Sequence, residues 1–347
     1  MFWFLQNVNF TLRNVVWKIF ELMNHSIFMN FTKQHLQNHH TKAVIDIAFH
    51  PNFPLLMTGS YDKSTIIYDI SSSPATIHHH LKDHTHIVRS VAFHPSLPLV
   101  ATGSDDHSTI IYDISTSPPT IKHHLKDGNR DPVDFVTFHP RLALLAANIK
   151  DCLTIIYDIS NILISPPIVK CRIRARCGRV TSVTFHPILP LFVTCSTSSI
   201  LFYDISTSPP IIEHMFGSIA SSGGIASSVL CVAFHPTLLF LATCSEDAPT
   251  LIYDTSVSPP TNTHSIRHHT RCVNSVAFHP RLPFLATGSA DCSTILYDIS
   301  TSRPTIKHHL KDHKVGVMSV AFHPSLPLLA TCSVDKSTIP YNLEKML

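Results

Sequence analysis

Short apolar runs separated by polar turns fill most of the chain. In residues 87–125 an apolar run ends at Phe93, and His94-Pro95-Ser96 follows as a turn, because proline cannot donate a hydrogen bond to a strand ladder. β-branched and aromatic residues, which are typical of strands, then alternate with polar breaks. The pattern predicts four short strands in one unit. They are Ile87–Phe93, Leu99–Gly103, Thr109–Ile114 and Thr120–Leu125.

The same unit recurs seven times. Each unit contains Phe-His-Pro at intervals of 44 to 49 residues, and a Tyr follows the Phe by 19 residues in six units and by 18 in the fourth. A four-stranded sheet of this size cannot bury both of its faces alone, so copies must stack around an axis. The repeats show no sustained 3.6-residue apolar period, which argues against a helical array. We therefore predict an all-β, seven-bladed β-propeller over residues 31–347, with four antiparallel strands per blade.

The two ends of the repeat array complement each other. The seventh unit lacks a fourth strand after Tyr341, and residues 32–40 resemble the fourth-strand segments at 76–84 and 305–313. We expect this N-terminal segment to pair with the last blade and close the ring, which removes exposed strand edges. Residues 1–30 stand outside the repeat and carry an approximately helical apolar stripe. They are predicted to form a short helical extension that docks onto the propeller or a partner.

The units resemble those of the WD-repeat family over about residues 31–343, with Tyr-Asp in place of the Trp-Asp signature. In that family an aromatic residue, a Ser or Thr, a His and a turn Asp form a hydrogen-bonded set that ties each blade together. The aromatic positions here are Tyr68, Tyr112, Tyr157, Tyr203, Tyr253, Tyr297 and Tyr341. The turn Asp positions are Asp62, Asp106, Asp151, Asp247, Asp291 and Asp335, and the His positions are His40, His84, His269 and His313.

The hydrogen-bonded set is incomplete in the middle of the chain. The fourth unit has Thr197 at the Asp position, and the third, fourth and fifth units have Asn129, Arg176 and Ile225 at the His position. Tyr can replace Trp because its ring fills apolar space while its hydroxyl forms hydrogen bonds. We expect these residues to be structural rather than catalytic, with the set plausible in four blades.

Composition and motifs argue against catalysis. The chain is 44% hydrophobic and only 14% charged, which indicates a large buried core. It contains no Gly-rich phosphate loop, Gly-x-Ser-x-Gly or His-Glu-x-x-His motif. Ser, His and Asp recur because the unit recurs, whereas a catalytic site needs a unique constellation. We predict a protein that is not an enzyme and uses no cofactor and no small-molecule substrate.

The 26 His residues raise the question of metal binding and of pH sensitivity. Imidazole titrates near pH 6.5, so the net charge, formally +3, should rise on mild acidification. The seven His of Phe-His-Pro are not expected to bind metal, because one His per blade is spread around a wide ring. The His runs at residues 78–80, 123–124 and 308–309 are expected to lie on solvated outer strands. A net charge this small also argues against a nucleic-acid partner.

The cysteines and the apolar runs indicate in which cellular compartment the protein is expected. The nine Cys include no Cys-x-x-Cys pair, which favours free thiols in a reducing compartment. No run of roughly 18 apolar residues occurs, and the first residues make a poor secretory signal. We therefore expect a cytoplasmic protein without a membrane segment, with the nucleus as the alternative.

Asymmetry between the units points to the site of function, because a binding site must differ from the copies around it. The densest basic run is Lys170–Arg179, between the third and fourth units, and a longer Gly/Ser/Ala-rich connection follows at 213–228. We predict a docking surface there for an acidic protein partner. Its candidate residues are Arg172, Arg174, Arg176 and Arg179. The alternative is an exposed loop without a binding role.

Two classes of function fit this pattern. The first is a scaffold or adaptor, acting as a monomer or as a subunit of a hetero-complex. The second is a substrate-receptor or regulatory subunit of a larger complex such as a ubiquitin ligase. Likeness to F-box receptors is confined to fragments such as Ile19–Leu22, and no Arg stands two places after the Tyr-Asp pairs, as it does in propellers that join cullin adaptors.

Overall fold

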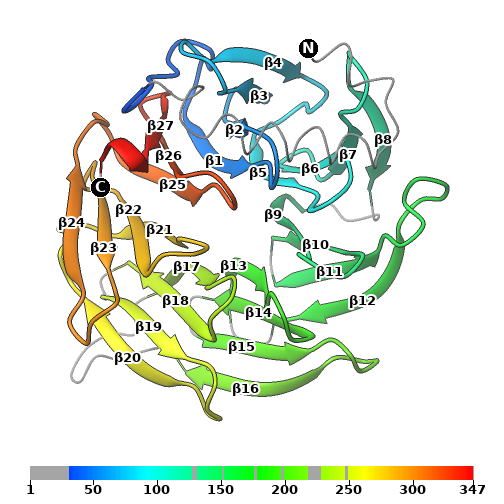
Figure 1. Cartoon of the computed structure of the whole chain (residues 1–347). Helices are drawn as coiled ribbons and strands as arrows, with labels where there is room; N and C mark the ends of the chain where they lie inside the picture. Colours follow the sequence, from blue (N-terminus) through cyan, green and yellow to red (C-terminus); the bar gives the residue numbers. More distant parts are fainter. Residues whose placement is uncertain are drawn as a thin grey trace, which may run out of the picture.

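The computed structural model describes residues 31–126, 131–150, 152–175, 178–196, 199–217, 228–246 and 249–346. They form seven antiparallel sheets around a central axis (Figure 1). The predicted seven-bladed β-propeller with four strands per blade is confirmed. The helix expected in residues 1–30 lies outside the described residues. Within the described ranges the only helical element is a 3-10 helix at Leu343–Lys345.

Each blade runs in chain order from an innermost to an outermost strand. Blade 1 contains β1 (Val44–Phe49), β2 (Leu55–Ser60), β3 (Thr65–Asp69) and β4 (Thr76–Leu81). Blade 2 contains β5 (Val88–Phe93), β6 (Leu99–Ser104), β7 (Thr109–Asp113) and β8 (Thr120–Leu125). Blade 3 contains β9 (Val133–Phe138), β10 (Leu144–Ile149), β11 (Leu153–Asp158) and β12 (Ile168–Arg174). Blade 4 contains β13 (Val180–Phe185), β14 (Leu191–Ser196), β15 (Ser199–Asp204) and β16 (Ile211–Gly217).

The remaining three blades follow the same order. Blade 5 contains β17 (Val229–Phe234), β18 (Phe240–Ser245), β19 (Thr250–Asp254) and β20 (Thr261–Ile266). Blade 6 contains β21 (Val273–Phe278), β22 (Phe284–Ser289), β23 (Thr294–Asp298) and β24 (Thr305–Leu310). Blade 7 contains β25 (Val317–Phe322), β26 (Leu328–Ser333) and β27 (Thr338–Asn342).

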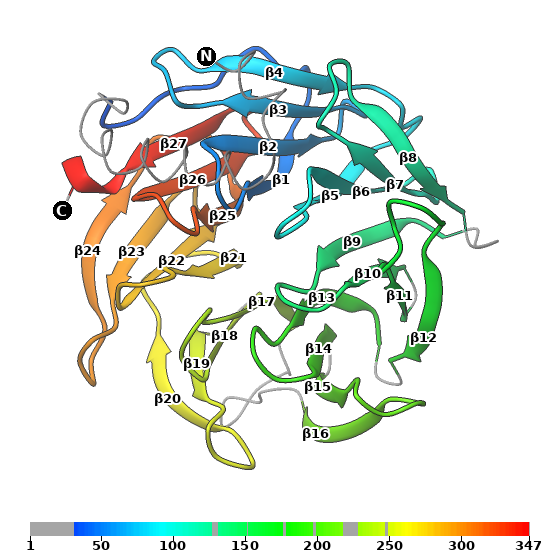
Figure 2. The same ribbon diagram turned by 45° about the vertical axis from the view of Figure 1, so that its right-hand side comes forward.

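Burial falls from the middle of a blade toward its outer strand. All six residues of β2 are buried, as expected for a strand covered on both faces, whereas most of β4 is exposed. The outermost strands form the rim of the ring (Figure 2). The His runs lie on these strands as predicted, but His79 is buried, with 7% of its surface exposed. The expectation that all of these His residues face water is therefore wrong at His79, which lies in the pleat beside Leu81 rather than on the outer face.

No blade has an apolar core of its own. Seven apolar clusters each combine residues from two neighbouring blades. Between blades 1 and 2, for example, Met57 and Ile67 pack with Val88 and Val91. Because every sheet is buried only by its neighbours, burial of both faces of each blade requires a closed ring.

A second set of links joins the innermost strands. The hydroxyl of Ser90 accepts the backbone N–H of Val136 in the next blade at 3.2 Å, and Ser182 and Ser275 do the same at later junctions. In blade 1 the equivalent residue is Asp46, which accepts the N–H of Val91 at 2.9 Å. Its carboxylate also accepts the hydroxyl of Ser319 from blade 7 at 3.3 Å. Burial raises the pKa of Asp46 to about 6, against the effect of these hydrogen bonds. Asp46 thus links the first blade to both of its neighbours.

Residues 31–40 complete the seventh blade. The N–H of Gln34 donates to the carbonyl of Pro340 at 3.0 Å, and Leu36 and Thr338 exchange hydrogen bonds at 2.9 and 3.1 Å. Lys33 also forms an ion pair with Asp312. The pairing with β27 is limited to two isolated bridges, so the closing segment is shorter than the strand expected over 32–40. Apolar contacts add to this limited backbone pairing, because the side chains of Phe31 and Leu36 are buried in the cluster between blades 7 and 1.

We predict that closure by this segment sets the stability of the whole ring. The Leu36→Ala variant should lose roughly 2–5 kcal/mol in urea unfolding, since it removes a buried side chain from the closing junction. The exposed neighbour variant Gln37→Ala should stay within about 0.5 kcal/mol of the parent. Deleting residues 31–40 should abolish cooperative unfolding. A deletion variant with unchanged melting would show that the ring closes without this segment.

Candidate interaction surface

Four blades bring together the predicted His and Asp with a Thr. In blade 1, Nδ1 of His40 donates to the Asp62 carboxylate at 2.9 Å, and its Nε2 lies 2.8 Å from Oγ1 of Thr58. The equivalent residues are His84, Asp106 and Thr102 in blade 2, His269, Asp291 and Thr287 in blade 6, and His313, Asp335 and Thr331 in blade 7. These contacts tie the segment that joins two blades to the turn between the second and third strands. The blade-joining segments and these turns lie on the same face of the ring, which we call the upper face.

The Asp residues of these sets are held ionised. Burial opposes the charge on Asp291, but hydrogen bonds from Ser293, the Thr270 N–H and His269 lower its pKa to about 2. In the other three blades equivalent bonds likewise outweigh burial and lower the pKa of Asp62, Asp106 and Asp335. A carboxylate with this many donors positions a turn rather than exchanging protons near neutral pH, which fits a structural role.

All seven predicted Tyr side chains are buried in the blades. The hydroxyl of Tyr341 donates to Asp312 at 3.1 Å, and in blade 6 the ring of Tyr297 stacks on His268 with ring centroids 5.6 Å apart. In both blades the residue immediately before the set's His contacts the Tyr. Burial raises the pKa of Tyr253 and Tyr297 to about 12, so both hydroxyls remain protonated at neutral pH.

Blades 3 to 5 differ at the same positions. Asp151, Asp247 and the replacing residues Asn129, Arg176, Thr197 and Ile225 lie outside the described residues. In the described part of blade 3, Ala147 stands where the other blades have the Thr of the set. In blade 4, the buried hydroxyl of Thr194 has no hydrogen-bond partner among the described residues. Ala147 is a sequence signal that the spacing analysis missed.

The structure separates the predicted arginines. Arg172 and Arg174 are exposed on β12, the outermost strand of blade 3, rather than in a connecting loop. Arg179 lies at the start of blade 4 on the upper face, where its guanidinium contacts the Asp134 carboxylate at 3.1 Å. Asp134 is also 3.3 Å from Arg89 of blade 2. Arg176 lies outside the described residues.

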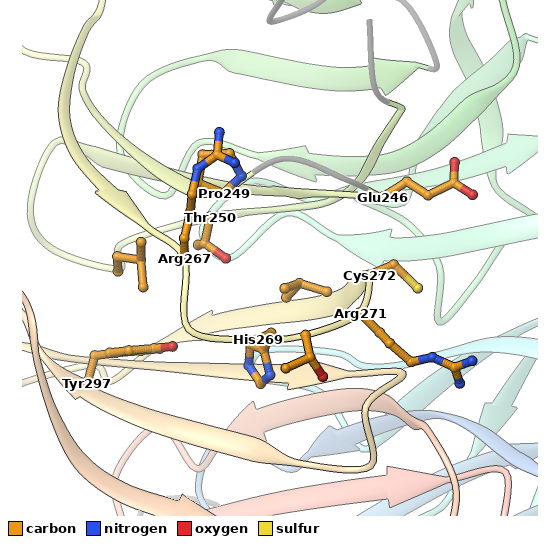
Figure 3. Close-up of a pocket in the computed structure, with 11 residues that line it drawn as sticks. Glu246, Pro249, Thr250, Arg267, His269, Arg271, Cys272 and Tyr297 are labelled. Atoms are coloured by element: carbon orange, nitrogen blue, oxygen red, sulfur yellow. The ribbon is translucent and has the colours of Figure 1, made fainter. Parts of the chain in front are cut away.

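A cavity of about 320 Å³ opens on the upper face between blades 5 and 6. Its lining includes Glu246, Pro249 and Thr250 of blade 5 and residues of the segment that leads from Arg267 to Cys272, and Figure 3 shows Arg267 beside Pro249 and Thr250, with His269 and Arg271 below them. His269 lines the cavity, and its side chain is only 4% exposed. Burial lowers the pKa of His269 and outweighs the opposing hydrogen bond to Asp291. The sequence did not predict this cavity, because it arises from the packing of two blades and not from a motif.

The family comparison agrees with this architecture. The WD domain, G-beta repeat family model matches residues 31–69, 75–113, 219–248, 260–298 and 304–339, which is just over half of the chain. The chain belongs to the WD-repeat family. Residues 114–218, which include all of blades 3 and 4, are not matched. No curated protein matches the chain in sequence.

The Phe-His-Pro histidines of this WD-repeat propeller cap the turns on the opposite, lower face. Nδ1 of His94 accepts the backbone N–H groups of Ser96 at 3.1 Å and Leu97 at 2.9 Å. The same pair of bonds forms in all seven blades, at His50, His94, His139, His186, His235, His279 and His323. All seven side chains are buried. An Nδ1 that accepts two N–H groups carries no proton, so each ring is neutral.

Three features of the described part of the chain concern metal ligands, thiols and membrane spans. Within it, no three His, Cys, Asp or Glu side chains are grouped so as to hold a metal ion. All eight described cysteines are free thiols. No helix among the described residues is long and apolar enough to cross a bilayer.

We predict that the His–Asp–Thr set stabilises each blade that carries it. The His84→Ala variant should lose about 1–3 kcal/mol in urea unfolding, because the partly buried Asp106 and the buried Thr102 lose their common partner. The His86→Ala variant alters an exposed His two residues away and should stay within about 0.5 kcal/mol of the parent. Equal losses in the two variants would contradict the prediction.

We predict steep destabilisation in mild acid. Burial lowers the pKa of His50 to about 3, lowers that of His94, His139, His186, His279 and His323 to about 4, and lowers that of His235. In the unfolded chain these residues take up protons near pH 6.5. Their contribution is therefore fully present above pH 6.5 and is lost as the pH falls toward 4.

One cap can test this dependence. The His94→Asn variant keeps a side-chain acceptor for the two N–H groups but removes the titrating ring. Its unfolding free energy should depend less steeply on pH between about 6.5 and 4, by up to about 1.4 kcal/mol per pH unit. His107→Asn, at an exposed turn position with φ of 68°, is the matched control and should keep the parental slope. Identical slopes in both variants would show that His94 does not resist protonation.

Proposed function

We propose that this propeller is a non-catalytic scaffold or adaptor that binds an acidic protein partner along the outer edge of blade 3. WD-repeat propellers generally serve as protein-interaction scaffolds and are typically not enzymes. The observation that carries the proposed site is the basic stripe, which we define as Lys170, Arg172 and Arg174 on β12. From Lys170 to the end of this strand, every second residue is exposed and basic.

The pleat of β12 explains how the basic stripe is presented. Alternate residues of a strand point to one face, at a spacing of roughly 7 Å. The intervening side chains of Cys171 and Ile173 pack against blade 4, which fixes the strand while the basic side chains face outward. Among the described residues, neither Arg172 nor Arg174 forms an ion pair. Two guanidinium groups held on one rigid strand suit bidentate contacts with carboxylates of a partner.

Arg179 extends the proposed surface toward the upper face. Its side chain is 52% exposed although one nitrogen contacts Asp134. The ion pair restrains the guanidinium and leaves its other donors available to a ligand. Arg179 is therefore proposed as a secondary contact, and Arg172 and Arg174 as the principal ones.

We predict that reversing the charge of the basic stripe releases the partner. Partners captured from cell extract, after nuclease treatment, should be lost from Arg172→Glu/Arg174→Glu with unchanged melting. Capture should also weaken with added salt, because salt screens exposed charge pairs. The control Lys307→Glu/Lys311→Glu changes two exposed basic residues at the outer strand of blade 6 and should retain the partner. Full retention by the Arg variant would contradict the proposal.

The same capture separates the two functional classes. If the chain is a receptor subunit of a ubiquitin ligase, deleting residues 1–30 should remove ligase components while proteins bound to blade 3 stay. A scaffold should keep its partners in that variant. The proposed setting for either role is the cytoplasm or the nucleus.

A further inference from the structure

Two cysteines of blade 5 face each other across neighbouring strands. Cys231 on β17 is the direct register partner of Cys244 on β18. Directly opposed residues of an antiparallel pair project from the same face, with Cα atoms about 4.5–5.5 Å apart. A disulfide spans Cα separations of about 4.4–6.8 Å, so the Cα separation of such a pair is compatible with a disulfide.

Blade 5 is the only blade with cysteine at both of these positions. The other blades pair Asp46 with Gly59, Ser90 with Gly103, Phe135 with Asn148, Ser182 with Cys195, Ser275 with Gly288, and Ser319 with Cys332. Blades 4 and 7 therefore have a cysteine opposite a serine and supply matched controls within the same chain.

The two thiols differ in access and in acidity. Cys231 is partly exposed on the innermost strand, whereas Cys244 is fully buried. A hydrogen bond from the Cys244 thiol lowers the pKa of Cys231 despite desolvation, while burial raises the pKa of Cys244. Cys231, the less buried of the two and the one whose pKa is lowered, is thus the better thiolate and the first to react, and Cys244 is placed to resolve the product.

The same junction contains the upper-face cavity. Val273 lines that cavity and belongs to the apolar cluster that Cys244 and Cys231 share with blade 6. Glu246, another cavity residue, stands two positions after Cys244. A covalent link between β17 and β18 would therefore fix strands that adjoin the cavity.

We propose that Cys231 and Cys244 are a thiol-modification site that forms a reversible disulfide by exchange with a low-molecular-weight disulfide. The Cys231 thiolate attacks one sulfur of that disulfide, the S–S bond breaks, and one small thiolate leaves and takes up a proton. Cys244 loses its proton to solvent and attacks the Cys231 sulfur, releasing the second small thiol. The two protein thiols are oxidised and the small disulfide is reduced to two thiols.

The test uses oxidised glutathione and the full chain. After incubation under native conditions, remaining thiols are blocked and the protein is cleaved with chymotrypsin without reduction. Mass spectrometry should show a Cys231–Cys244 disulfide that dithiothreitol removes. In Cys244→Ser the reaction should stop with one glutathionyl group on Cys231, because no resolving thiol remains. In Cys332→Ser, the matched position of blade 7, the Cys231–Cys244 bond should still form.

A second variant keeps the test decisive if Cys244→Ser fails to fold. Cys244→Gly introduces the residue found at this position in blades 1, 2 and 6, and it should give the same trapped adduct as Cys244→Ser. The proposal is overturned if folded parental protein keeps glutathione on Cys231, if Cys231 joins Cys195 instead, or if neither cysteine reacts.

Discussion

Contact between the His of one blade and the Phe of the next is the interaction on which the ring depends. His94 packs on Phe138 with ring centroids 4.9 Å apart, and the pattern continues at every junction to His323, which packs on Phe49 at 5.1 Å and so closes the circle. Each Phe-His-Pro motif therefore serves two junctions. The His can do this only when neutral, because its Nδ1 already accepts the two N–H groups of its own turn and its ring is buried against Phe. One tripeptide thus fixes a turn, a blade spacing and the closure of the ring.

These junctions explain how blades 3 to 5 keep their fold while departing from the family pattern. Ala147 removes the Thr of the hydrogen-bonded set in blade 3, yet His139 still caps its turn and packs on Phe185 of blade 4. The apolar clusters on either side of blade 4 are also continuous. Since neighbours hold each blade, the local set can be altered without losing the ring. The basic stripe, the cavity and the cysteine pair all involve these three blades, where the regular pattern is relaxed.

Repetition made most of the fold predictable from the sequence. Features that depend on contact between blades could not be predicted in this way. The expected strands Ile87–Phe93 and Thr120–Leu125 match β5 and β8 to within one residue. The role of the Phe-His-Pro His was missed, because the turn was assigned to Pro and the acceptor geometry of Nδ1 has no sequence signature. Arg172 and Arg174 were expected in a connecting loop. The two-residue alternation of basic side chains with Cys171 and Ile173 is the pattern of a half-exposed strand, so this placement on β12 could have been read from the sequence. The cavity and the Cys231–Cys244 register had no such signal in a single unit.

The two faces of the ring use histidine in opposite ways. On the upper face, Nδ1 of His40, His84, His269 and His313 donates to an Asp whose pKa is lowered. On the lower face, protonation of Nδ1 would set an N–H against two backbone N–H groups in all seven blades. Acid should therefore act on the lower turns and on the His–Phe junctions they support. Since each blade is buried only by its neighbours, failure of these junctions removes the support of every blade at once.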